Sequence, residues 1–262
     1  MKLVTFAGGN FCNQLYYVLQ AYLTGNRYVV TCPHLDNKTI YSQMLDFLGN
    51  DRYILSYDKV CGRKIFKENS YKQGYGKDFL EDDLKRFILN VILDSGYFRR
   101  EIPDQNMAAI HIRNGDYLLP RNYQFNCFDR RDYVAKACEA VKINHPDIDT
   151  LNIYSNDNEL NFRLYDNIFK KFFGRISYVT GTTVIQDFVG LSLTKTKILF
   201  NSTFSFWSSF VSNVVFQDSE RNIFCPDRYI AKISEKNEFC DVIPISFECN
   251  PRWNFIKVLP GK

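Results

Sequence analysis

The feature that most constrains the fold of this chain is the regular alternation of apolar strands with helices after residue 106. The predicted strands cover 107–113, 151–155, 176–179, 197–200 and 214–216, and the predicted helices cover 131–143, 159–172, 184–193 and 204–211. Strands that alternate with helices form a parallel sheet with right-handed crossovers. The sequence therefore predicts an α/β domain here, with an irregular tail after Pro226.

The first 105 residues carry a shorter version of the same pattern. A strand at 3–7 leads through a glycine turn into a helix at 13–24, which Gly25 ends in the capping position. The other predicted elements are a strand at 27–31, a helix at 41–48, a strand at 53–56 and a helix at 78–94. The boundary falls in the polar stretch 99–106, so we expect two Rossmann-like domains with parallel sheets, 1–105 and 106–262.

Composition argues against several classes of protein. The formal net charge is only +4 and no run of basic residues occurs, so no nucleic-acid partner is expected. The eight cysteines form no Cys-x-x-Cys pair and only three histidines accompany them, so no metal site is expected. The first apolar run is too short for a secretory signal, and no later run reaches the length of a membrane span. We expect a cytoplasmic protein with reduced thiols, and peripheral association with a membrane stays open.

One predicted strand ends in a group of residues suited to a phosphate-bearing substrate. The strand at 107–113 delivers His111 and Arg113, and Gly115 and Asp116 follow directly. Open α/β sheets bind ligands beyond the carboxyl ends of their strands, and the arginine offers a fork of donors that matches phosphate oxygens. The alternative is an ion pair between Arg113 and Asp116 that fixes the turn at Gly115.

Two other predicted strands also end in polar residues. Asp157 either accepts a hydrogen bond from a ribose, base or sugar hydroxyl or caps the helix that follows it. Ser202 and Thr203 can cap the next helix and also donate hydrogen bonds to phosphate. The only Asp-x-Asp triplet, 147–149, precedes a strand and is therefore at the wrong edge of the sheet for a metal-dependent transferase.

Taken together and in order, these segments resemble glycosyltransferase family 11, the alpha-1,2-fucosyltransferases. The matching motifs are Gly8-Gly9 with Asn13-Gln14-Leu15, Gln73-Gly74-Tyr75, His111-Ile112-Arg113-x-Gly115-Asp116-Tyr117, the helix from Tyr133 to Val141, Tyr154-Ser155-x-Asp157 and Asn201-Ser202-Thr203-Phe204-Ser205-x-Trp207. The resemblance implies a GT-B architecture of two facing Rossmann-like domains. It also implies inverting, metal-independent transfer of fucose from GDP-fucose to a hydroxyl of a glycan acceptor.

The resemblance assigns roles to individual residues. Arg113 would neutralise the negative charge that grows on the departing diphosphate. Asp116 is the candidate general base for the acceptor hydroxyl, or it orients Arg113 instead. The donor would also contact His111, Asp157, Ser202, Thr203 and Phe204. The acceptor side of the cleft would include Gly9, Asn13 and Gln14, although Asn13 can equally be the N-cap of the helix it opens.

Two positions depart from the family pattern. Asn114 stands where the family carries a second arginine, and Asn10-Phe11-Cys12 replaces a shorter segment. The arginine change leaves four alternatives open. The donor is held more weakly, another cation such as Arg121 or Lys195 substitutes, the donor is a different nucleotide sugar, or the protein is a catalytically inactive glycan-binding relative.

Overall fold

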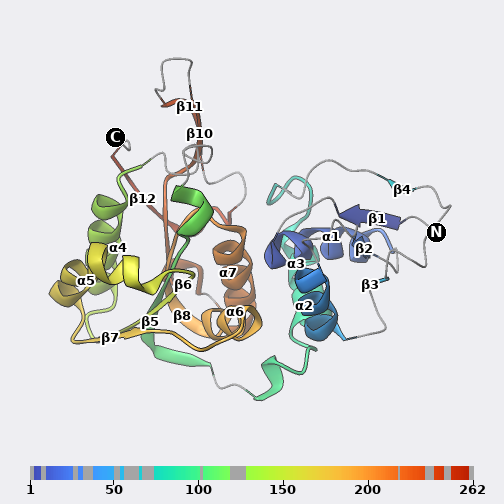
Figure 1. Cartoon of the computed structure of the whole chain (residues 1–262), viewed down its shortest axis with the longest axis horizontal. Helices are drawn as coiled ribbons and strands as arrows, with labels where there is room; N and C mark the ends of the chain where they lie inside the picture. Colours follow the sequence, from blue (N-terminus) through green and yellow to red (C-terminus); the bar gives the residue numbers. More distant parts are fainter. Residues whose placement is uncertain are drawn as a thin grey trace. The chain divides into compact units, whose positions relative to one another are not determined.

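The computed structural model describes residues 3–6, 10–25, 29–31, 38–49, 54–55, 65–66, 74–100, 103–118, 128–217, 219–233, 239–244 and 249–259. The chain forms two compact units (Figure 1). The first unit comprises Met1–Glu101 together with Val184–Val189, and the second comprises Ile102–Thr183 together with Gly190–Lys262. Each unit contains a parallel sheet, so the predicted α/β fold class is confirmed.

The sheet of the first unit has the strand order β3-β2-β1-β4. Its strands are β1 (Leu3–Phe6), β2 (Val29–Thr31), β3 (Ile54–Leu55) and β4 (Ile65–Phe66). Its helices are α1 (Phe11–Leu23), α2 (Lys38–Leu48) and α3 (Glu81–Phe87), and α3 continues as a π-helix, η2 (Ile88–Ile92). The sequence predicted a strand at the position of β3 but none at the position of β4.

Helix α1 begins two residues earlier than the sequence indicated. Asn10 occupies the N-cap position, and the N–H of Asn13 donates to the carbonyl of Asn10 at 2.9 Å within the first turn. Asn13 is therefore not the N-cap, and that alternative was wrong. Gly25 has a φ of 65°, a left-handed conformation that favours glycine, so the predicted helix end is confirmed.

A cluster of aromatic rings closes the core of the first unit. The rings of Phe11 and Phe47 are 5.2 Å apart, and Phe188 lies 5.5 Å from Phe11 and 5.7 Å from Phe47. Phe98 completes the cluster at 6.4 Å from Phe188. All four side chains are buried, and edge-to-face packing of this kind stabilises the folded state beyond area burial alone. A segment from late in the sequence therefore contributes to the core of the first unit.

The sheet of the second unit has the strand order β12-β9-β8-β5-β6-β7, with every neighbouring pair parallel. Its strands are β5 (Asp104–Ile112), β6 (Thr150–Ser155), β7 (Arg175–Tyr178), β8 (Thr194–Leu199), β9 (Ile223–Pro226) and β12 (Asn254–Ile256). The chain moves outward from β5 to β6 and β7, then returns to the other side of β5 to form β8. The strand order thus reverses between β5 and β8, and ligands of open α/β sheets bind at such a switch point.

Helices cover both faces of this sheet. The helices are α4 (Arg130–Asn144), α5 (Asn158–Phe172), α6 (Val184–Ser192) and α7 (Thr203–Val215). Ala108, Ile110 and Ile112 of β5 pack in one core cluster with residues of α4 and α5, whereas Ala109 packs on the opposite face with Leu191. Figure 1 shows α4 and α5 on one side of β5 and α7 on the other. Burial on both faces explains why β5 is an almost continuous apolar run.

Two predictions for the end of the chain were wrong. Residues 214–216 do not form a strand, since Val214 and Val215 continue α7 and the strand follows at β9. A short apolar run fits a helix and a strand equally well. The tail is also not irregular, because β10 (Arg228–Ile233) and β11 (Phe239–Pro244) form an antiparallel pair and β12 joins the sheet edge beside β9.

Two further findings concern the cysteines and the helices of the described residues. Cys12, Cys138, Cys225 and Cys249 are buried and free, as expected of thiols that serve as small core residues. None of the helices described is both long enough and apolar enough to cross a bilayer.

Candidate active site

Arg113 follows the last residue of β5, at the carboxyl edge of the sheet and beside the switch point. Its side chain is partly buried, and its guanidinium carbon lies 5.3 Å from the ring centroid of Tyr117. A cation at this distance over an aromatic face is attracted to the ring. The sequence placed Arg113 at a strand end of this kind.

Gly115 makes the turn after Arg113 possible. Its φ is 62°, and a Cβ at this position would lie 2.7 Å from Nδ2 of Asn156. Only glycine meets both requirements at low cost. A short 3-10 helix, η4 (Gly115–Leu118), follows and carries Asp116, whose side chain is outside the described part of the structure.

Asn114 lies at the centre of a buried hydrogen-bond network. Its N–H donates to Oδ1 of Asn156 at 2.9 Å, and its Nδ2 donates to Oδ1 of Asn161 at 2.8 Å and to the carbonyl of Asp157 at 3.3 Å. Its Oδ1 accepts from Nη2 of Arg130 at 2.9 Å. Both ends of the Asn114 amide are thus bound by protein groups, and the side chain is fully buried.

Arg130, the first residue of α4, connects this network to Arg113. Its Nη2 donates to the carbonyl of Arg113 at 2.9 Å, and its guanidinium carbon lies 4.9 Å from the ring centroid of Phe200. Burial lowers the pKa of this guanidinium, and its Nε and Nη1 have no hydrogen-bond partner. Arg130 was not predicted, because it follows Arg113 by 17 residues and belongs to none of the motifs.

His111 is held in its neutral form at this edge. It is 8% exposed, its Nδ1 lies 2.7 Å from Oγ of Ser205, and its ring centroid is 4.7 Å from that of Phe204. Burial, with a smaller effect from the charge of Arg113, lowers the pKa of the imidazole to about 3. At neutral pH His111 can therefore contribute hydrogen bonds to this site, but no charge.

Two of the predicted donor-binding residues are helix N-caps. Oδ1 of Asp157 accepts from the N–H of Leu160 at 2.9 Å at the start of α5. Oγ of Ser202 accepts from the N–H of Phe204 at 3.3 Å at the start of α7. Thr203 is the first residue of α7, so Ser202, Thr203 and Phe204 all follow β8 directly. The second unit thus brings His111, Arg113 and these three residues to neighbouring strand ends on the two sides of the switch point.

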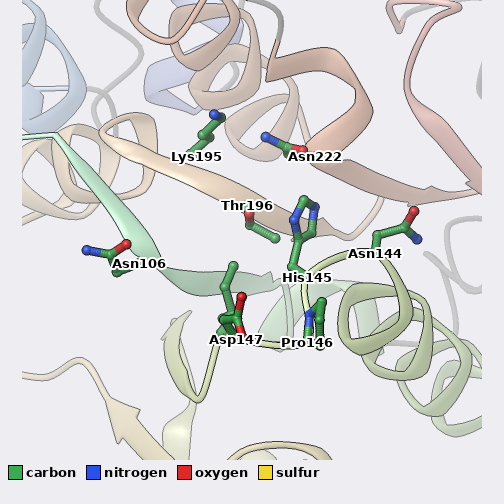
Figure 2. Close-up of a pocket in the computed structure, with 9 residues that line it drawn as sticks. Asn106, Asn144, His145, Pro146, Asp147, Lys195, Thr196 and Asn222 are labelled. Carbon is green, nitrogen blue, oxygen red and sulfur yellow. The ribbon is translucent and has the colours of Figure 1, made fainter.

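A polar pocket of about 390 Å³ lies at the opposite, amino edge of the same sheet (Figure 2). Its lining includes Lys195 at the start of β8, Asp147 before β6 and His145 after α4. Lys195 therefore lies at the wrong edge to substitute for a second arginine beside Arg113, and only this candidate cation is excluded. Asp147 is also at the amino edge, as predicted, and Asp149 accepts from the N–H of Gly174 at 2.8 Å.

The predicted acceptor-side residues belong to the first unit. Asn13 and Gln14 lie in the first turn of α1, and the side chain of Gln14 is buried. Gly9 and Arg121 fall outside the described residues.

We compared the sequence with models of known protein families, and one match includes the carboxyl edge of the second sheet. The family model described as Glycosyl transferase family 11 matches residues 57–215, which is more than half of the chain. The chain belongs to glycosyltransferase family 11. The matched segment includes Arg113, Asn114 and Arg130 and extends to the end of α7. Membership of family 11 supports glycosyltransferase activity, with a nucleotide sugar and a glycan acceptor as substrates.

Comparisons of this family 11 member with individual proteins show only distant similarity. No match was found among curated proteins. Among solved structures, the chain is similar to the ADP-heptose lps heptosyltransferase II of E. coli, with 11% sequence identity and a TM-score of 0.44. The alignment covers 100% of this chain and 92% of the heptosyltransferase chain.

Proposed function

We propose that this protein transfers fucose from GDP-fucose to a hydroxyl of a glycan acceptor, with inversion at the sugar and without a metal ion. The observation that carries the proposal is the place of Arg113, at the switch-point edge of a parallel sheet and inside the segment that matches family 11. The predicted GT-B arrangement of two facing units is part of the same proposal.

The proposed reaction is a single displacement. An oxygen of the acceptor forms a bond to C1 of fucose while the bond from C1 to the diphosphate oxygen breaks, so the configuration at C1 inverts. The acceptor proton goes to a general base and GDP leaves with the bonding electrons. Negative charge grows on the diphosphate in the transition state, so a cation that meets this charge lowers the barrier.

Arg113 is the residue that we assign to this charge. A neutral His111 cannot neutralise a diphosphate, but its imidazole and the hydroxyl groups of Ser202 and Thr203 can orient one by hydrogen bonds. A guanidinium stays charged at physiological pH and presents paired donors to phosphate oxygens. The proposed metal independence therefore depends on arginine and on the N-terminal end of α7.

Asp116 is the proposed general base, and the Asp116→Asn variant tests this role. If Asp116 takes the acceptor proton, we expect the rate to fall about 100-fold or more, because general bases commonly contribute this much. The acidic limb of the pH-rate profile should disappear, while GDP affinity stays within about twofold of wild type. Loss of GDP affinity with an unchanged profile would instead assign Asp116 to the orientation of Arg113.

The donor is tested by thermal shift with GDP, UDP, ADP and CDP. At about 100 times its Kd, a ligand stabilises the folded state by about 2.7 kcal/mol, which corresponds to roughly 5 to 10 °C in a chain of this size. We expect a shift of this size for GDP and a much smaller one for the other nucleotides. Hydrolysis of GDP-fucose without acceptor, followed by release of GDP, gives an independent measure of activity.

The other outcomes of this experiment separate the remaining alternatives. A selective response to UDP or another nucleotide would replace GDP-fucose with a different nucleotide sugar. No response to any nucleotide, together with no hydrolysis, would contradict transferase activity and indicate a glycan-binding relative.

A further inference from the structure

We propose that Arg130 is a positioning residue for Arg113, and that it fixes the backbone from which Arg113 meets the diphosphate of the donor. This inference rests on the proposed function, because it concerns the same group in the same reaction. It assigns a role to a buried arginine that no sequence motif identified.

Arg130 contacts two consecutive residues, Arg113 and Asn114. Nη2 donates to the carbonyl of Arg113 and to Oδ1 of Asn114, at 2.9 Å in each case. These two acceptors flank the position at which the chain leaves β5 and turns toward Gly115. One guanidinium nitrogen therefore restrains the backbone orientation of Arg113, from which its side chain projects.

The same turn is fixed from the opposite direction by residues at the end of β6 and directly after it. Asn156 accepts from the N–H of Asn114 at 2.9 Å, and Oγ of Ser155 donates to the carbonyl of Ile112 at 2.8 Å. The carbonyls of Ile112 and Arg113 and the N–H of Asn114 are thus bound by residues of α4 and by residues at the end of β6. Such double restraint is expected where a side chain must be held within fractions of an ångström.

The incomplete hydrogen bonding of the Arg130 guanidinium argues that this residue serves more than stability. Its guanidinium is largely buried, and no carboxylate contacts it among the residues that the structure describes. Two of its three nitrogens lack a hydrogen-bond partner, and burial without full pairing is costly. A diphosphate bound near Arg113 would add negative charge close to this cation and offset part of that cost.

Hydrogen exchange tests the positioning role without reference to activity. We expect Arg130→Met to speed exchange of the amides at 113–118 about 10-fold or more, because the backbone loses one of its two restraints. Arg131→Met is the matched control, since Arg131 is the next residue, is exposed, and donates to the carbonyl of Leu164 at 2.7 Å instead. If exchange at 113–118 is the same in both variants, the proposal is overturned.

A double-mutant cycle tests the connection to catalysis. We expect Arg130→Met to lower kcat for hydrolysis of GDP-fucose by about 10- to 100-fold, as misplacement of a catalytic group does. In an Arg113→Ala background the same change should alter kcat by less than about twofold, because no Arg113 side chain remains to be positioned. If Arg130→Met acted only by reducing the amount of folded enzyme, it would lower kcat by the same factor in both backgrounds. That result would overturn the proposal.

Two further outcomes complete the design. Arg130→Lys keeps the charge and a donor nitrogen on a shorter side chain, so we expect intermediate values in both experiments, and it replaces Arg130→Met if that variant does not fold. If wild-type protein neither binds GDP nor hydrolyses GDP-fucose, the proposed function and this inference both fail. If wild-type protein is active and both Arg130 variants match it, only the inference fails.

Discussion

Replacing Arg113 with alanine is expected to lower the rate of fucosyl transfer by about 100- to 1,000-fold. A single preorganised group that meets developing charge commonly contributes this much, or about 3 to 4 kcal/mol of barrier. Because the negative charge grows during the reaction, kcat should fall more than the KM for GDP-fucose rises. Steady-state kinetics with GDP-fucose measure both values, with hydrolysis as the readout until an acceptor is known.

Two companion variants make the Arg113 result specific. Arg113→Lys keeps the charge but loses the paired donors, so its rate should fall between those of wild type and Arg113→Ala. Arg175→Ala removes an exposed arginine at the amino edge of the same sheet and should change the rate by less than about twofold. An Arg113→Ala enzyme that keeps more than about a tenth of wild-type activity would contradict the proposed role.

The second large effect is expected in the stability of the protein toward acid. The folded state holds the pKa of His111 at about 3, whereas an unfolded histidine has a pKa of about 6.5. Below pH 6.5 the unfolded chain binds a proton that the folded chain does not, so the free energy of unfolding decreases as the pH falls toward 3. The full effect is on the order of 5 kcal/mol, and above pH 6.5 His111 contributes no pH dependence.

Urea unfolding of wild type and His111→Asn between pH 3 and pH 8 isolates this contribution. Asparagine keeps a polar atom near Oγ of Ser205 but does not titrate, so its profile should be flatter than that of wild type below pH 6.5. His145→Asn is the control. Burial also lowers the pKa of His145, but this side chain is more exposed than that of His111. A stability difference between wild type and His111→Asn that is constant from pH 7 to pH 4 would contradict a buried neutral imidazole.

The position of the candidate site was predictable because it depends on local pattern and one topological rule. A strand buried on both faces is a long apolar run, and the run that ends at Ile112 identifies β5 without help from the rest of the chain. The carboxyl end of such a strand is where an open α/β sheet binds ligands. Arg113 could therefore be assigned to this edge from the sequence.

The partners of Asn114 could not be predicted in the same way. Asn156, Asn161 and Arg130 approach it only because β6, α5 and α4 pack around the end of β5. No local pattern distinguishes these polar residues from the many others on helices and loops. The sequence showed that a second arginine was missing at 114, but it did not show that this position is enclosed by protein.

Some ambiguities were resolved by contacts rather than by pattern. Asp157 and Ser202 were open to capping or to ligand binding, because the same side-chain oxygen serves either purpose, and the structure has both as N-caps. The error at 214–216 has a similar origin, because short apolar runs do not specify helix or strand.

The contribution of Phe188 to the aromatic cluster has a consequence for the order of events during synthesis. Phe11, Phe47 and Phe98 leave the ribosome long before Phe188 does, so the first unit lacks one of its core rings while Ile102–Thr183 of the second unit is being made. Domains of larger proteins usually fold as they emerge, N-terminal first. In this chain the first unit can complete its core only after Phe188 has emerged, so its folding overlaps with synthesis of the second unit.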